Sequence, residues 1–228
     1  MVRHFETKVL VDGGSGTLQR LVTAGVDPRD LDGGVYSHRH VDHSGDLVPL
    51  LFTLKVGMDK PRTRDYPIFA GEGFVAFLDA LRGVYGSGIQ GSDWGLPVTE
   101  LPLDGPGEAE LPGGIRLLTQ PANHTAGALH LRFEAGGRSV VFSGDTGPSD
   151  NLATLAERCD VLVCECAVGE AGDSGHLCPE EVLEIVRHAR PQRVVLTHFY
   201  PSVDEEDALR VVGQAGIPVE RGYDGQIV

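Results

Sequence analysis

Basic residues are scarce in this sequence. Its 228 residues include 19 Lys and Arg against 33 Asp and Glu, a formal net charge of −14 at pH 7. Proteins that bind long nucleic acids neutralise phosphates with Lys and Arg, so this shortage disfavours a long RNA or DNA partner. A small anionic substrate held at bound metal ions remains compatible with the charge, because the ions offset it locally.

Long apolar runs are also absent. No run approaches the roughly 18 residues that a membrane-spanning helix needs, and no charged-then-apolar leader opens the chain. We therefore expect a soluble, cytoplasmic protein with no membrane partner. No composition shift or low-complexity segment marks a boundary, and we expect residues 1–228 to form a single domain.

Cysteine is rare, and its four copies all lie within residues 159–178. Such a cluster is not the framework of a disulfide-rich secreted protein. Cys164 and Cys166 alternate around Glu165 as side chains of a strand do. The pattern predicts buried thiols rather than a zinc knot.

Glycine and proline are abundant, with 31 and 14 copies that separate short apolar segments. Strands are expected first, and helices then alternate with strands, which predicts an α/β (α+β) fold of two sheets packed face to face with helices outside. The expected strands are residues 9–11, 35–36, 68–70, 98–103, 115–118, 128–133, 139–142, 161–166 and 194–197. The expected helices are residues 17–24, 47–54, 74–81, 150–158 and 179–189.

Two segments carry no recognisable motif. Residues 55–65 contain four basic side chains, for which we favour a solvated loop over a phosphate-facing loop. Residues 83–95 are rich in glycine and predict a flap over a pocket. Within that flap, Trp94 would either stack on a substrate ring or pack in the core.

A dense polar motif follows the strand at Val35 and Tyr36. His38, His40, Asp42 and His43 stand in an H-x-H-x-D-H register. An apolar core could not bury these four side chains without a polar partner for each. Imidazole nitrogens and carboxylates are ligands of zinc and similar divalent ions, so the motif predicts a metal centre.

Three later motifs place further ligand types at strand ends. His124 lies in Gln-Pro-Ala-Asn-His-Thr, Asp145 in Phe-Ser-Gly-Asp-Thr and His198 in Leu-Thr-His-Phe. Together with the first motif they supply seven ligands, too many for one tetrahedral ion. Two ions roughly 3.5–4 Å apart suit such a set, and they would lower the pKa of a bridging water to near 7.

This succession of motifs resembles the metallo-β-lactamase-fold superfamily over most of the chain. The resemblance implies a four-layer αββα sandwich. It also implies that His38, His40 and His124 hold one ion, that Asp42, His43 and His198 hold the other, and that Asp145 bridges them. Asp42 would also orient or deprotonate the attacking water. Zn²⁺ is the favoured ion and Mn²⁺ the alternative.

Within that superfamily the chain is most similar to the ribonuclease Z-like phosphodiesterases. Phe-Ser-Gly-Asp-Thr and the strand carrying Glu165 resemble theirs, and His176 occupies the place of their additional histidine, 22 residues before His198. The resemblance implies that His176 protonates the leaving group while Glu165 holds its other nitrogen. A loop histidine beside an ordinary strand carboxylate is the alternative.

The chain also departs from those enzymes. Only twenty residues separate His124 from Asp145, which leaves no room for the arm that grips transfer RNA. The resemblance therefore implies an arm-less phosphodiesterase acting on a small or cyclic phosphodiester. The alternatives are a lactone or thioester hydrolase, which would use a tyrosine such as Tyr200 or Tyr223 as oxyanion donor, and a non-catalytic metal-dependent partner module.

Two expectations concern the first residues. Asp12, after the strand at residues 9–11, would either support the metal loop or merely form a turn. Relatives usually have about two strands ahead of this one, so the fold is expected to lack the usual first strands, or to complete the sheet edge with a partner subunit in a homodimer. His4, His130 and His188 lie outside every motif and are expected at the surface or in packing.

Overall fold

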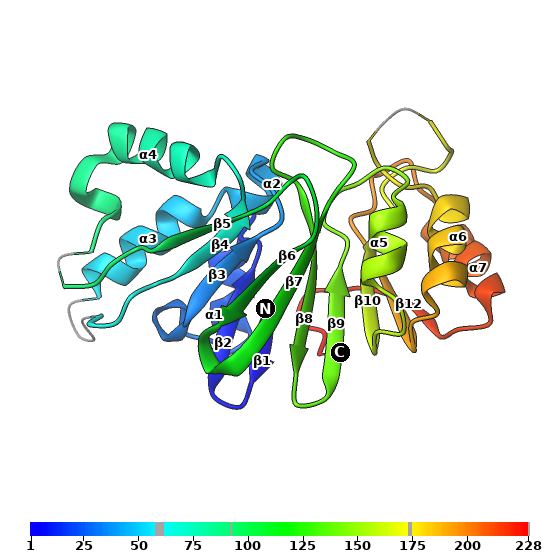
Figure 1. The fold of residues 1–228 in the computed structure, drawn as a ribbon, viewed down its shortest axis with the longest axis horizontal. Helices are drawn as coiled ribbons and strands as arrows, with labels where there is room; N and C mark the ends of the chain where they lie inside the picture. The colour runs from blue at the N-terminus through cyan, green and yellow to red at the C-terminus, as the bar shows by residue number, and fades with distance from the viewer. Residues whose placement is uncertain (58–61, 92, 173–174, 228) are drawn as a thin grey trace. The chain divides into compact units, whose positions relative to one another are not determined.

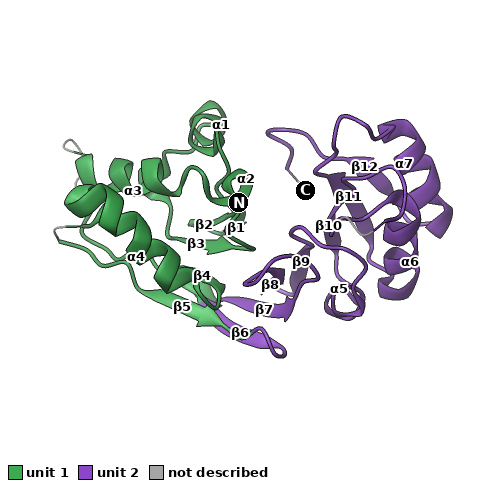
Figure 2. Cartoon of the chain, turned by 90° about the horizontal axis from the view of Figure 1, so that it is seen from above, with its two compact units in different colours: residues 1–102, 111–114 green, residues 103–110, 115–228 purple. Residues whose placement is uncertain are grey.

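The computed structural model describes residues 1–57, 62–91, 93–172 and 175–227. The chain divides into two compact units, coloured separately in Figure 2. Unit 1 comprises residues 1–102 and 111–114, and unit 2 comprises residues 103–110 and 115–228. Each unit contains most or all of one sheet and its own helices.

Unit 1 is built on a five-stranded sheet with the order β1-β2-β3-β4-β5 (Figure 1). β1 runs antiparallel to β2, and β2 to β5 are parallel to one another. The strands are β1 Val2–His4, β2 Thr7–Val11, β3 Gly33–Tyr36, β4 Ile68–Gly71 and β5 Val98–Leu101. The helices are α1 Thr17–Thr23, α2 Val41–Ser44, α3 Leu47–Val56 and α4 Phe74–Tyr85, with 3-10 turns η1 Pro28–Asp30, η2 Gly86–Ile89 and η3 Pro112–Gly114.

One apolar cluster joins the helices of unit 1 to its sheet. Leu50 and Leu54 from α3 and Phe74 from α4 are buried against Tyr36 and Ile68 of the strands. Each such large side chain contributes about 1.5–3 kcal/mol when it leaves water. These helices therefore hold the parallel strands in place, which sets the positions of the loops at the strand ends.

Trp94 belongs to the same cluster. Its side chain is 9% exposed and packs in the core, so the packing alternative is confirmed over stacking on a substrate. The helix α4 runs to Tyr85 and is followed by η2, so the first part of the expected flap is helical. Residue 92 of that segment lies outside the described residues.

The expectation of a solvated basic loop is wrong for Arg62, which is buried. Its guanidinium donates to the carbonyl oxygens of Leu31 at 2.9 Å and Asp65 at 2.8 Å and lies over the rings of Tyr66 and Trp94. A planar guanidinium suits such a site because it offers five donors and can stack on aromatic faces. Residues 58–61 of this segment, including Lys60, lie outside the described residues.

Unit 2 is built on a seven-stranded mixed sheet with the order β12-β11-β10-β9-β8-β7-β6. β7, β8 and β9 are antiparallel neighbours, whereas β9 to β12 are parallel. The strands are β6 Gly107–Leu111, β7 Ile115–Pro121, β8 Leu129–Ala135, β9 Arg138–Phe142, β10 Val161–Glu165, β11 Arg193–Thr197 and β12 Val219–Arg221. The helices are α5 Asp150–Leu155, α6 Pro179–Ala189 and α7 Glu205–Val212, with the 3-10 turn η4 Gly213–Ala215.

The four cysteines lie in the core of unit 2, as predicted, and all are free and buried. Burial raises the pKa of Cys159 to about 11 and that of Cys166 to about 12. Cys178 also caps the N-terminus of α6, where its backbone N–H donates to the Glu181 carboxylate at 2.9 Å. These thiols are structural, because a buried neutral thiol is a weak nucleophile and metal ligand.

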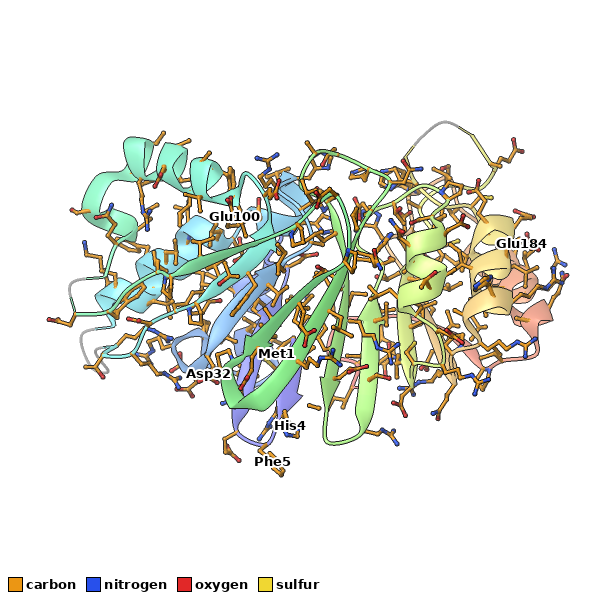
Figure 3. The ribbon with its side chains drawn as sticks, in the orientation of Figure 1. Met1, His4, Phe5, Asp32, Glu100 and Glu184 are labelled. Carbon is orange, nitrogen blue, oxygen red and sulfur yellow. The ribbon has the colours of Figure 1, made fainter. Side chains whose placement is uncertain are left out.

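The observed elements agree with most of those expected and add several. β1, β6, β12, α2 and α7 were not expected, and α5 ends at Leu155 rather than at residue 158. β6 is short and rich in Glu, so its apolar signal is weak. α7 has an apolar face of Ala208, Val211 and Val212 and an Asp204 N-cap, a signal that the sequence reasoning overlooked. β1 forms the edge of the first sheet, so the expectation that first strands are missing is wrong for this strand. In Figure 3 His4 and Phe5 mark the turn between β1 and β2.

Within the described residues, no helix is long and apolar enough to cross a membrane. The single domain of residues 1–228 stays a prediction.

Candidate metal centre and proton-donor pair

The candidate ligands of unit 1 follow the end of a parallel strand. β2, β3 and β4 are paired in parallel, with Val11 opposite Val35 and Tyr36 opposite Ala70. The carboxyl ends of these strands therefore meet at one edge of the sheet. Asp12 leaves the end of β2 there, and the H-x-H-x-D-H loop leaves the end of β3.

Asp12 supports this loop directly. Its Oδ1 accepts from the Ser37 backbone N–H at 2.7 Å, and its Oδ2 accepts from the Ser37 hydroxyl at 2.7 Å. The same Oδ2 lies 2.8 Å from His43 Nδ1, and the Ser37 hydroxyl lies 3.1 Å from His38 Nδ1. Contacts of this kind fix the Nδ1–H tautomer of both imidazoles and direct Nε2 to the ligand role.

The ligand candidates of unit 1 lie close together. The ligand atoms of His38 and His40 fall within 4.8 Å of each other, as do those of Asp42 and His43. His43 Nε2 is 3.7 Å from Asp42 Oδ2. That distance is too long for a hydrogen bond, but two ligand atoms on one tetrahedral ion are about 3.4 Å apart.

In unit 2 the polar candidates also follow parallel strands. β9, β10 and β11 are adjacent and parallel, with Val163 opposite Phe142 and Glu165 opposite Thr197. Asp145 follows β9, Glu165 is the last residue of β10, and His198 follows β11. His198 has a φ of 58°, in the left-handed region that non-glycine residues seldom adopt and that often marks functional sites.

Asp145 lies between two imidazoles of its own unit. Its Oδ2 is 3.9 Å from His124 Nε2 and 3.6 Å from His198 Nε2, and the carboxylate is buried. His124 Nδ1 lies 3.0 Å from the Gly175 carbonyl oxygen, which again directs Nε2 to the ligand role. The donor types, tautomers and spacings of both units therefore fit divalent metal ions.

A second group in unit 2 joins Glu165, His176 and Tyr200. His176 Nδ1 lies 3.0 Å from Glu165 Oε1, and His176 Nε2 lies 3.1 Å from the Tyr200 hydroxyl. The His176 ring also contacts the rings of His124 and His198, with centroids 5.1 and 5.6 Å apart. The predicted pairing of Glu165 with His176 is present, and the loop places His176 beside the candidate ligand histidines of its unit, His124 and His198.

The Glu165 carboxylate, although close to His176 and His198, is a poor metal ligand in this arrangement. Backbone N–H groups of Thr146, Ala167 and Leu177 donate to its oxygens at 2.6, 3.3 and 3.1 Å. With His176 these donors occupy its four lone-pair positions. Burial raises the pKa of the Glu165 carboxyl, while the hydrogen bonds from Thr146, Leu177 and His176 oppose that shift.

The histidines outside the motifs differ from one another. His188 is exposed on α6, as expected. His130 is fully buried on β8, where Nδ1 lies 2.6 Å from the Ser143 carbonyl oxygen and Nε2 lies 2.9 Å from the Ser149 hydroxyl. It is a packing histidine, also as expected, and it holds the loop that carries Asp145.

The sequence of the chain matches a known family. Residues 7–199 match the family model described as a beta-lactamase superfamily domain. The chain belongs to the β-lactamase superfamily. Membership and the His/Asp clusters make it a metal-dependent hydrolase with the metallo-β-lactamase fold, so the predicted fold class and enzyme class are confirmed.

Two relatives of the chain are both named ribonuclease Z. A ribonuclease Z of Bacillus licheniformis is 26% identical over 253 aligned positions, covering 90% of this chain and 82% of the relative. A ribonuclease Z of Mycolicibacterium paratuberculosis is 33% identical over 171 positions, 72% of this chain and 61% of the relative. The resemblance to ribonuclease Z-like metallohydrolases is therefore confirmed.

Solved structures share the fold. The metallo-β-lactamase fold protein YhfI from Bacillus subtilis has a TM-score of 0.84 at 23% identity, covering 98% of this chain and 88% of its own. The short form of human tRNase Z has a TM-score of 0.80 at 18% identity, covering 100% of this chain and 90% of its own.

Sequence reasoning missed two contributors to the site. It gave no role to Ser37, which couples Asp12 to His38, and it left Tyr200 without a position. The sequence signal that could have identified Ser37 is its position directly before His38, the first candidate ligand. No sequence signal pairs Tyr200 with His176, 24 residues earlier.

Proposed function

We propose that the chain is a dinuclear metal-dependent phosphodiesterase that acts on a small or cyclic phosphodiester. The observation that carries this proposal is the Glu165–His176 pair at 3.0 Å beside the ligand histidines of unit 2. A positioned proton donor suits a phosphodiester because its alkoxide leaving group is poor.

The seven predicted ligands would hold the two ions. His38, His40 and His124 are assigned to one ion, Asp42, His43 and His198 to the other, and Asp145 to both. Membership of the superfamily and the ligand spacings within each unit support this assignment. Bound divalent ions would supply Lewis acidity, which lowers the pKa of water and polarises phosphoryl oxygens. Zn²⁺ is proposed, with Mn²⁺ as the alternative.

The protein's own residues would move the protons. The side chain of Asp42 is 54% exposed, so it can reach an attacking water and accept its proton. His176 would deliver a proton from Nε2 to the leaving oxygen. Glu165 would hold Nδ1 and stabilise the imidazolium before that transfer. The backbone N–H donors on Glu165 fix this carboxylate, so the imidazole has one defined orientation.

Two features favour a small substrate over transfer RNA. The segment between His124 and Asp145 consists of β8, a tight turn and β9, with Gly136 and Gly137 at positive φ, and contains no additional arm. The net charge of −14 opposes binding of a long polyanion. The relatives named ribonuclease Z favour RNA as the second candidate.

The decisive experiment measures metal content and hydrolysis in parallel. Wild type is expected to bind two ions per chain and to cleave bis(p-nitrophenyl) phosphate and a 2′,3′-cyclic nucleotide, whose leaving group is an alkoxide. His176→Ala should keep both ions but lose roughly 10²–10⁴-fold in kcat on the cyclic nucleotide. The loss on the nitrophenyl ester should be smaller, because nitrophenolate leaves without a proton.

His188→Ala is the matched control, since His188 is an exposed histidine of the same unit. It should leave both activities unchanged. Two bound ions without phosphodiesterase activity would contradict the proposal and favour the lactone or thioester hydrolases, which an acyl-lactone and thioester panel would detect. Bound metal without turnover of any ester would favour the non-catalytic partner module.

A further inference from the structure

The Tyr200 hydroxyl lies 3.1 Å from His176 Nε2, the nitrogen that the proposed function assigns to proton delivery. The two rings meet in a T-shaped contact with centroids 5.2 Å apart, and the Tyr200 ring also contacts His198 at 5.5 Å. Residue Tyr200 is 42% exposed, whereas residue His176 is 8% exposed. The phenol therefore lies on the solvent side of the imidazole.

The backbone around Tyr200 holds the phenol in this position. The Tyr200 N–H donates to the carbonyl oxygen of Ala167, two residues after the end of β10, at 3.2 Å, and the Tyr200 carbonyl accepts from the Val203 N–H at 2.9 Å. The preceding Phe199 packs against the hydrophobic core of unit 2. Tyr200 is thus attached to the same strand end that carries Glu165.

His176 is consequently held at both ring nitrogens, by the last residue of β10 and by a tyrosine bonded to the loop that follows β10. Glu165 contacts Nδ1 and Tyr200 contacts Nε2. With only one of these contacts, the ring could rotate about its χ2 torsion, which is broad for histidine. With both, its plane is fixed, and proton transfer requires such alignment.

We infer that Tyr200 is a positioning residue that aligns the His176 imidazole for proton delivery to the leaving group. This inference rests on the proposed function. A hydroxyl suits the task because it can both donate and accept. Before the reaction the single Nε2–H donates to the phenol oxygen. When the leaving oxygen takes this proton, the Nε2–H bond breaks, and the phenol O–H can then donate to the freed Nε2 lone pair. A phenylalanine ring would keep the packing but lose this property.

Tyr200→Phe tests the inference through its dependence on the leaving group. In zinc-reconstituted protein, kcat on the 2′,3′-cyclic nucleotide should fall roughly 10- to 100-fold with KM little changed. Hydrolysis of bis(p-nitrophenyl) phosphate should fall far less. The matched control is Tyr223→Phe, since Tyr223 is an exposed tyrosine of the same unit, and it should match wild type.

Two further readouts separate positioning from a merely structural role. In the His176→Ala background, Tyr200→Phe should cause no further loss, because Tyr200 acts through His176. The ¹⁵N signal of His176 Nε2 should shift in Tyr200→Phe and stay unchanged in Tyr223→Phe. Equal losses on both esters, additive losses in the double variant, or an unchanged ¹⁵N signal would overturn the inference.

Failure of the proposed function can be distinguished from failure of the inference about Tyr200. Wild type would then show no phosphodiesterase activity at all, whereas the ¹⁵N shift would still report whether Tyr200 aligns His176. If the wild type is an active phosphodiesterase and Tyr200→Phe has the same kcat as the wild type on both esters, the inference about Tyr200 is refuted while the proposed function stands.

Discussion

Asp12 organises three side chains of the metal loop through a single carboxylate. It accepts from the backbone and hydroxyl of Ser37, contacts His43 directly, and reaches His38 through the Ser37 hydroxyl. Of the two roles that the sequence left open for Asp12, support of the loop is the one present. Its φ of 53° lies in the left-handed region, which aspartate and asparagine tolerate better than most residues.

Asp12→Asn tests this support without changing the backbone preference. The neutral amide cannot accept from His43 and Ser37 as the carboxylate does, so we expect metal affinity to fall roughly 10- to 100-fold. Zinc competition titrations would measure the change, with exposed Asp104→Asn as the matched control. Unchanged affinity in Asp12→Asn would show that the loop holds its geometry without this carboxylate.

At the scale of elements, His130 joins β8 to the loop after β9 and to the start of α5. Its contacts are the Ser143 carbonyl and the Ser149 hydroxyl, and Ser149 also caps α5 through the Leu152 N–H at 3.3 Å. Burial lowers the pKa of His130 from 6.5 to about 4, because the interior disfavours the charged ring. The folded protein therefore keeps this histidine neutral.

This lowered pKa predicts a loss of stability in mild acid. Between pH 6.5 and about 4 the unfolded chain binds a proton at residue 130 that the folded protein does not. The free energy of unfolding should fall as the pH drops through this window, by up to about 3 kcal/mol from this residue. Urea unfolding of wild type and His130→Gln at pH 7.5 and pH 5 would isolate the contribution.

His130→Gln should be less stable at pH 7.5 but lose less between the two pH values. His188→Gln, at an exposed site, should retain the wild-type dependence. An identical pH dependence in wild type and His130→Gln would contradict the assignment.

Arg62 also shows how packing can override a sequence pattern. Four basic residues among eleven predict a solvated segment, yet Arg62 is buried against carbonyl oxygens and two aromatic rings. Its neighbour Arg64 follows the expectation, since it is half-exposed and pairs with Asp32. Composition cannot separate two arginines that lie two residues apart, because their difference lies in long-range partners.

At the scale of the whole molecule, the acidic charge predicts poor binding of RNA. At 100 mM salt we expect a transfer RNA precursor to bind weakly, with a Kd above roughly 10⁻⁵ M, because few basic side chains replace its counterions. Filter binding and a cleavage assay beside the cyclic nucleotide would measure this. Micromolar binding with cleavage of the precursor would instead support the activity that its relatives' names describe.

The sequence by itself determined the fold class of this protein and its class as a metal-dependent hydrolase. The H-x-H-x-D-H motif is local, and the later ligands follow apolar strands whose pattern is strong, so the order of motifs predicts the family that residues 7–199 match. The boundaries of α6 were predicted for the same reason, since Pro179 begins it and an apolar stripe marks its length. β1 and β6 lacked that signal because they are short, whereas the apolar face and the Asp204 N-cap of α7 were overlooked.

The tertiary structure alone decided which side chains support the chemistry. The contact of Tyr200 with His176, the burial of Arg62 and the enclosure of His130 each join residues distant in sequence. None leaves a periodic or compositional trace, because a hydrogen bond between distant segments depends on where the strands place their ends. The candidate ligands can therefore be recognised from local motifs, whereas the orientation of their side chains depends on the folded strands.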